Sequence, residues 1–248
     1  MSCAGGHADA LGMNEPIETL LFDFGGTLDA NGVAWKERFY GFYRAEGLEM
    51  APEAFEPGFF AADSSLVGNL PPATDLSGTV HALVANLEVE LTLRSRADEP
   101  HSSNGRTNGY RGARVASRFL SEASAAFARN RPVLEVLKQR YRLGVVSNFY
   151  GNLEAVCQGA GLASLFAVLV DSHCVGAEKP NPAIFQVALD KLRASPETTL
   201  FVGDSLRRDR EGARRMGMRF IWMMPQGGPE QSVEHAITEL PELMRILQ

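Results

Sequence analysis

The chain has 248 residues, of which 45% are hydrophobic and 22% charged, a composition typical of a globular protein with a substantial buried core. Its formal net charge of −6 argues against a nucleic-acid partner, which would require unpaired clusters of Lys and Arg. The chain has three scattered cysteines, Cys3, Cys157 and Cys174, which predict reduced thiols in a cytoplasmic protein. It has no long uninterrupted apolar run, so we predict no membrane partner.

The beginning of the chain predicts a tail, a strand and then an insertion. Residues 1–15 lack the basic start and apolar run of a signal peptide, so we predict a flexible tail. Residues 19–24 form an apolar, strand-like run, and more than 100 residues separate it from the next such run. Since one crossover helix needs far fewer residues, we predict a helical cap at 31–130, inserted into a core of 16–30 and 131–248.

Within the cap, apolar residues recur at helical spacing in four segments. These segments are residues 35–46, 52–62, 76–93 and 113–129. The polar segment 94–111 predicts a loop, and Pro132 suits the first turn of a separate crossover helix. We expect the cap to open and close over the core, with hinges at residues 30–32 and 130–132. The aromatic residues Trp35, Phe39, Tyr40 and Tyr43 are expected in the cap core.

After the cap, strand-like and helix-like segments alternate. The strand-like segments are continuous apolar runs, as in a parallel sheet covered on both faces. They are residues 143–148, 166–172, 199–204 and 219–223. The helical segments between them are residues 152–159, 182–193 and 208–216. This alternation predicts an α/β fold with a Rossmann-like, doubly wound parallel sheet.

Polar residues follow the predicted strands where their carboxyl ends should line a crevice. Asp23 ends the first strand in LLFDFGGTLD, and Ser147 lies at the end of the second. Lys179 precedes a helix that begins with Pro182, and Asp204 follows another strand. Taken singly, each residue could be a helix cap or a solvated surface group. Their convergence on one sheet edge instead predicts one site.

Together these segments resemble the four motifs of the haloacid dehalogenase superfamily, over residues 17–30 and 131 to about 225. The resemblance implies a hydrolase with an α-helical cap and a Mg²⁺ cofactor, acting on a small phosphorylated metabolite. Asp23 would be the nucleophile that forms an aspartyl-phosphate, while Ser147 and Lys179 would hold the phosphoryl group. The remaining implied phosphate-binding residues are Gly26, Thr27 and Asn148. The implied metal ligands are Asp23, the main-chain carbonyl of Gly25, Asp204 and Asp209.

One position departs from the resemblance. Most phosphatases of the superfamily carry an acid/base Asp two residues after the nucleophile, and this chain has Gly25 there. Loss of a general acid or base commonly removes about 100-fold to 10,000-fold of rate. A substitute could come from Asp29, Glu37 or His81, or the leaving group could need little protonation.

Two other functions stay open at this point, besides a phosphatase. A phosphonatase would use a cap lysine to form a Schiff base, and Lys36 is the nearest such lysine by sequence. The second alternative is a protein that binds phosphorylated ligands or a partner without turnover. A dehalogenase of the superfamily works without metal, and the GDSLRRD segment instead resembles the metal-binding phosphatases. His173 and Cys174 follow the third strand and could lie near the rim of the crevice, but a packing or loop role is the favoured interpretation. The oligomeric state is predicted to be monomer or homodimer.

Overall fold

The computed structural model describes residues 15–98, 109–228 and 235–247, and the predicted tail lies almost wholly outside them. Six parallel strands form one sheet in the order β3-β2-β1-β4-β5-β6. The strands are β1 Thr19–Phe22, β2 Arg142–Ser147, β3 Val168–Asp171, β4 Thr199–Gly203, β5 Arg219–Met223 and β6 Ala236–Ile237. The parallel, Rossmann-like sheet is therefore confirmed, and the two-residue edge strand β6 is an addition to it.

Two layers of helices cover the sheet, as its continuous apolar strands require. Leu21 and Phe201 point to one face, where they pack with α7 Pro182–Leu192 and α8 Glu211–Met216. Leu20 and Phe22 point to the other face, toward α4 Gly109–Lys138. The remaining core helices and helical turns are α5 Leu153–Gly159, η1 Ala163–Leu165, α6 Ser172–Val175, η2 Pro196–Thr198, η3 Leu206–Arg210, η4 Leu240–Glu242 and α9 Leu243–Ile246.

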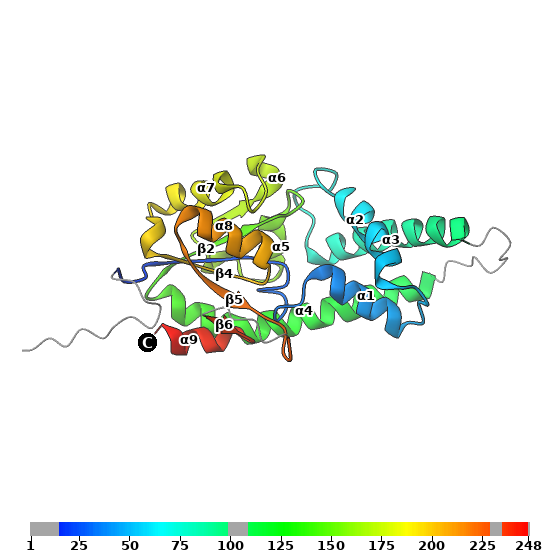
Figure 1. The fold of residues 1–248 in the computed structure, drawn as a ribbon, viewed down its shortest axis with the longest axis horizontal. Helices are drawn as coiled ribbons and strands as arrows, with labels where there is room; N and C mark the ends of the chain where they lie inside the picture. Colours follow the sequence, from blue (N-terminus) through cyan, green and yellow to red (C-terminus); the bar gives the residue numbers. More distant parts are fainter. Residues whose placement is uncertain (1–14, 99–108, 229–234, 248) are drawn as a thin grey trace, which may run out of the picture.

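The inserted helices form a second lobe beyond the carboxyl ends of the strands (Figure 1). They are α1 Trp35–Ala45, α2 Pro52–Ser64, α3 Leu76–Asp98 and the first part of α4. Phe39 stacks on Phe119 with ring centroids 4.7 Å apart, and Tyr43 is fully buried. Tyr40 is only half-buried, and its hydroxyl donates to the Met50 carbonyl. Aromatic packing therefore forms the interior of this lobe.

Helix α4 corrects two predictions. Pro132 lies inside this helix, so the predicted separate crossover helix and the break before it were wrong. The predicted loop at 94–111 is helical at both ends, and its middle, residues 99–108, lies outside the described residues. Helix α4 is continuous because its buried residues recur at helical spacing from the cap to the sheet, as with Phe119, Phe127 and Leu134. The hinge predicted at 130–132 thus falls within a single helix.

None of the helices in the described ranges combines the length and apolar character needed to cross a membrane.

Candidate active site

The carboxyl ends of β1, β2 and β4 bring the predicted residues together. Phe22 of β1 pairs with Val145 of β2 and with Val202 of β4, so the residues that follow these strands lie on one edge of the sheet. Asp23 continues β1 by donating its N–H to the Val202 carbonyl, at 2.9 Å. Its carboxylate faces the crevice described below. Sheet register alone therefore fixes the position of the predicted nucleophile.

Asp23 lies in a tight network of charged and polar groups. Its Oδ1 is 2.7 Å from the Lys179 ammonium and accepts from the Ser147 hydroxyl at 2.8 Å. The same ammonium is 2.7 Å from Asp209 Oδ1. Burial alone would lower the pKa of Lys179, but the neighbouring Asp209 and Asp23 carboxylates raise it above its ordinary value. Lys179 is therefore a fixed positive charge between two acids.

Asn148 holds the main chain of Lys179. Its side-chain Oδ1 accepts from the Lys179 N–H at 2.7 Å, and its Nδ2 donates to the Lys179 carbonyl at 3.2 Å. Asn148 was predicted to bind phosphate, and the structure places its amide on protein atoms instead. Phosphate binding by Asn148 stays a prediction.

Three carboxylates form a compact cluster. One oxygen from each of Asp23, Asp204 and Asp209 lies within 4.8 Å of the others. Burial and the charges of Asp23 and Asp209 raise the pKa of Asp204 well above its ordinary value. Burial also raises the pKa of Asp209 in spite of Lys179, with Asp23 adding to the effect. An all-oxygen set of like charges, with Asp23 and Asp209 buried and Asp204 half-buried, suits a hard divalent cation, so these residues fit a metal ion.

The turn after Asp23 depends on Gly26, which adopts φ +85°. A Cβ atom there would lie 2.5 Å from the Asp204 carboxylate, so only glycine fits. The Gly26 N–H donates to Asp29 Oδ1 at 2.7 Å, and the Thr27 N–H donates to the Phe24 carbonyl at 3.3 Å. Gly26 and Thr27 were predicted to bind phosphate, and the structure shows that the backbone N–H groups of both already donate hydrogen bonds within the protein.

Gly25 lies against the indole of Trp35. A Cβ atom at Gly25 would lie 3.2 Å from Trp35 Nε1. The indole is held there because its N–H donates to Asp29 Oδ2 at 2.7 Å. The Arg38 guanidinium also binds Asp29 Oδ2, at 2.8 Å, and lies 3.8 Å from the centre of the Phe119 ring. The ring of Trp35 thus lies beside the backbone at Gly25, two residues after Asp23.

The candidate acids differ in their access to the site. Asp29 is fully buried and bonded on both oxygens, and burial raises its pKa despite Arg38. Glu37 lines the crevice, with its side chain 53% exposed. His81 is exposed on α3, bonds to its own helix and is not among the described residues that line the crevice. Only Glu37 of these three therefore borders the crevice.

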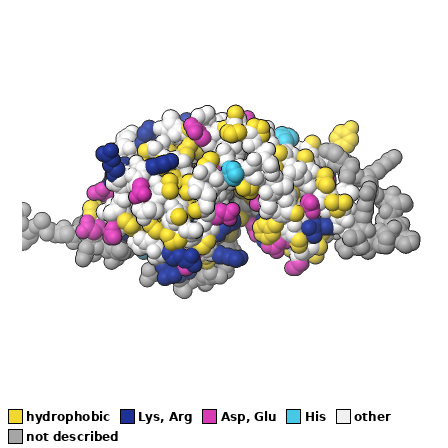
Figure 2. Space-filling model, turned by 90° about the horizontal axis from the view of Figure 1, so that it is seen from above, with side chains coloured by type: hydrophobic (Ala, Val, Ile, Leu, Met, Phe, Trp, Pro, Cys, Tyr) yellow, Lys and Arg dark blue, Asp and Glu magenta, His cyan; other side chains and the backbone are white. Residues whose placement is uncertain are grey.

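The crevice is a cavity of about 610 Å³ between the core and the cap. In Figure 2 the surface is indented between the two lobes. Asp23, Ser147 and Lys179 line its core side, and α1 and α2 line the other side. His173 and Cys174, for which a packing or loop role was favoured over a place at the rim, are not among the described residues that line this cavity.

Sequence reasoning missed the cap wall of the cavity. Asp63 at the end of α2 accepts a hydrogen bond of 2.5 Å from the Tyr150 hydroxyl, which joins cap to core. Burial raises the pKa of both groups. Phe60 lies one helical turn before Asp63 on the same wall. Helical spacing could have placed Phe60 and Asp63 on one face of α2, but no motif indicated that this face borders the site.

Comparison with known proteins identifies the family. Residues 17–217 match the family described as haloacid dehalogenase-like hydrolase. The chain is 34% identical over 113 residues to haloacid dehalogenase-like hydrolase domain-containing protein 3 from Bos taurus, covering 44% of this chain and 45% of that protein. It is 30% identical over 138 residues to glyceraldehyde 3-phosphate phosphatase from Pyrococcus furiosus, covering 52% and 56%. The aligned regions span about half the length of these curated relatives.

A solved structure shares the whole architecture. The HAD phosphatase from Thermococcus onnurineus superposes with a TM-score of 0.53 at 21% identity, covering 93% of this chain and 98% of that one. At this identity the likeness supports the fold alone, including sheet and inserted helices. The fold and the family match agree, and the chain belongs to the haloacid dehalogenase-like hydrolases.

Proposed function

We propose that this hydrolase is a Mg²⁺-dependent phosphohydrolase that acts on a small organic phosphate through an aspartyl-phosphate at Asp23. The observation that carries the proposal is the Lys179 ammonium, 2.7 Å from both Asp23 and Asp209. A carboxylate can attack an anionic phosphoryl group only where cations offset the repulsion. The phosphatase name of the Pyrococcus furiosus relative agrees with a phosphohydrolase activity.

The proposed reaction has two steps, and each site residue has its own role in them. An Asp23 oxygen attacks phosphorus, the bond from phosphorus to the ester oxygen breaks, and that oxygen leaves with the electron pair. Water then attacks the phosphorus, the bond to Asp23 breaks, and phosphate and a proton are released. Lys179 neutralises charge throughout, and the Ser147 hydroxyl orients Asp23 before attack. Mg²⁺, held by Asp23, Asp204 and Asp209, would supply further positive charge for the phosphoryl oxygens.

The proposal includes the absence of the usual acid. Gly25 offers no side chain, and Asp29 is bonded on both oxygens by Gly26, Trp35 and Arg38. A leaving oxygen of low basicity needs little protonation, so such esters are the favoured substrates.

The phosphonatase alternative is weakened by Lys36. Its ammonium lies 2.7 Å from Glu56 and 3.3 Å from Glu37. The hydrogen bond that Lys36 donates to Glu56 raises the pKa of Lys36 above its ordinary value. A Schiff base forms from the neutral amine, which this environment disfavours. Lys36 therefore fits a charged wall of the cavity better than a nucleophile.

Phosphate release tests the proposal. Purified protein is incubated with acetyl phosphate, whose leaving group is weakly basic, with Mg²⁺ or with EDTA. We expect Mg²⁺-dependent release that Asp23→Asn abolishes, whereas Asp190→Asn, an exposed Asp on α7, retains it. Phosphate binding without release in the wild type would instead support the ligand-binding alternative. Release that survives Asp23→Asn would remove Asp23 as the nucleophile.

A further inference from the structure

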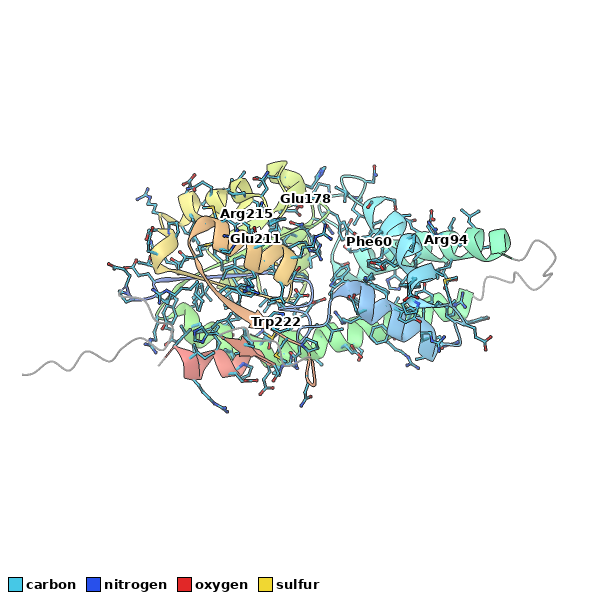
Figure 3. The ribbon with its side chains drawn as sticks, viewed as in Figure 1. Phe60, Arg94, Glu178, Glu211, Arg215 and Trp222 are labelled. Carbon is cyan, nitrogen blue, oxygen red and sulfur yellow. The ribbon has the colours of Figure 1, made fainter. Side chains whose placement is uncertain are left out.

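The cap wall of the cavity exposes apolar side chains to the candidate active site. Phe60 is 49% exposed and Val67 is 38% exposed, and both line the cavity. Neighbouring Phe59, by contrast, is 3% exposed because it packs in the cap interior. In Figure 3 the labelled Phe60 lies on the side of the cap that faces the core, with the labelled Glu178 on the core. Large exposed apolar groups inside a cavity indicate contact with a ligand.

We propose that the substrates are phosphate esters of aromatic hydroxyl groups, and that the ring of the leaving group stacks on Phe60. The inference rests on the phosphohydrolase function proposed above and adds the class of leaving group. Two independent features of the cavity support it, namely its size with its apolar wall and the surroundings of Gly25.

Size is the first feature. A cavity of about 610 Å³ falls within the range of about 300–1,000 Å³ that holds drug-sized ligands. A three-carbon phosphate would fill only a small part of it and leave Phe60 and Val67 against water. An aromatic ring would cover apolar surface of this wall, and Asp23 and Lys179 line the core side of the same cavity.

The second feature is the missing acid. Gly25 has no side chain and the Trp35 indole lies beside it, so position 25 supplies no carboxylate that could protonate a departing oxygen. When Asp23 attacks, the bond from phosphorus to oxygen breaks and the aryloxide leaves with the electron pair. The ring delocalises this negative charge, and water then protonates the aryloxide. An alkoxide has no such stabilisation, so alkyl esters should react far more slowly.

A binding experiment tests the ring site without turnover. Calorimetry in the presence of Mg²⁺ compares phenylphosphonate with methylphosphonate, neither of which has an ester bond to hydrolyse. We expect wild type to prefer phenylphosphonate, and Phe60→Ala to reduce this preference by about twofold to tenfold. Val89→Ala is the matched control, because Val89 is 58% exposed on α3 and is not among the described cavity residues. It should keep the wild-type preference.

Turnover tests the leaving group. Phenyl phosphate, benzyl phosphate and acetyl phosphate separate the ring from the basicity of the leaving oxygen. We expect kcat/KM for phenyl phosphate to exceed that for benzyl phosphate by about 100-fold or more, because kcat/KM reports the step in which the ester oxygen leaves. Phe60→Ala should lower the ratio of kcat/KM for phenyl phosphate to that for acetyl phosphate, chiefly through KM.

The outcomes distinguish the two levels of the proposal. Equal binding of the two phosphonates, or a preference that survives Phe60→Ala, would overturn the ring site even if acetyl phosphate is hydrolysed. Benzyl phosphate turned over as fast as phenyl phosphate would overturn the choice of leaving group. No release from any of the three esters would refute the phosphohydrolase function itself and with it the substrate class, whereas the phosphonates would still report whether a ring binds.

Discussion

Lys179 offers the most direct test of how the charges of the site are balanced. It is 3% exposed and its ammonium bridges Asp23 and Asp209, which belong to the three-carboxylate cluster. Lys179→Met keeps most of the side-chain volume and removes the charge. Breaking a buried ion pair by removing one partner commonly costs about 3–5 kcal/mol, since the other charge is left unpaired. For a chain of this size, that corresponds to roughly 6–20 °C in Tm.

The assay is thermal unfolding in EDTA and in excess Mg²⁺. In EDTA we expect Lys179→Met to lose stability by the amount above, whereas Lys191→Met, at an exposed position on α7, stays within about 0.5 kcal/mol of wild type. Mg²⁺ at about 100 times its Kd adds roughly 2.7 kcal/mol to a protein that binds it only when folded.

At one Mg²⁺ concentration for both proteins, Mg²⁺ should stabilise Lys179→Met more than wild type, because the lysine no longer competes with the metal for the same carboxylates and the Kd for Mg²⁺ falls. If Lys179→Met unfolds in EDTA at the temperature of Lys191→Met, the carboxylates do not depend on this lysine. An equal Mg²⁺ effect in both proteins would show that the ion binds away from the cluster. Either result would refute the reasoning.

Three further predictions concern the surroundings of the site. Gly25→Asp should gain less than tenfold on an alkyl phosphate, and unfold about 1–3 kcal/mol more easily in urea, because the new side chain meets Trp35. Burial raises the folded-state pKa of Asp63, so wild type loses stability as pH rises and the buried carboxyl must ionise. Asp63→Asn has no such group, so its free energy of unfolding should rise relative to that of wild type between pH 4 and pH 8. Arg38→Met should cost about 3–5 kcal/mol in urea unfolding, and Asp29→Asn in the same chain should recover part of that loss.

Each of these three has a clear contrary result. A gain of 100-fold or more with Gly25→Asp would show that Trp35 yields easily and that only the missing carboxylate limits alkyl esters. A difference between Asp63→Asn and wild type that stays constant with pH would mean that Asp63 does not titrate in this range. Equal stability of the single Arg38 variant and the double variant would mean that Asp29 is not left unpaired.

The residues nearest the chemistry were predictable because each follows a continuous apolar strand. Sheet topology then brings Asp23, Ser147 and Asp204 to one edge, whatever the rest of the chain does. Lys179 was predictable only through the motif it resembles, since its approach to Asp23 depends on a loop. That loop is held by Asn148, whose amide bonds to the Lys179 backbone, a pairing across 31 residues that no local pattern indicates.

Predictions failed where tertiary packing overrides a local signal. Pro132 favours a helix start, yet α4 runs through it because both the cap and the sheet pack on the same apolar stripe. The cap wall was missed for another reason: Phe60 and Asp63 differ from ordinary helix residues only in what they face. Their importance comes from the position of α2 over the core, which the sequence of α2 does not encode.

Asp29 connects the turn after the predicted nucleophile to the cap helix α1. The sequence offers Asp29 as one possible replacement acid, but burial and three hydrogen-bond donors give it a structural role. One oxygen holds the turn at Gly26, and the other holds Trp35 and Arg38 of the cap helix α1. A single carboxylate therefore fixes the loop after the nucleophile, and with it the ring that lies beside Gly25. The turn that contains Gly25 and the indole beside it are therefore one structural feature, because the same carboxylate holds both.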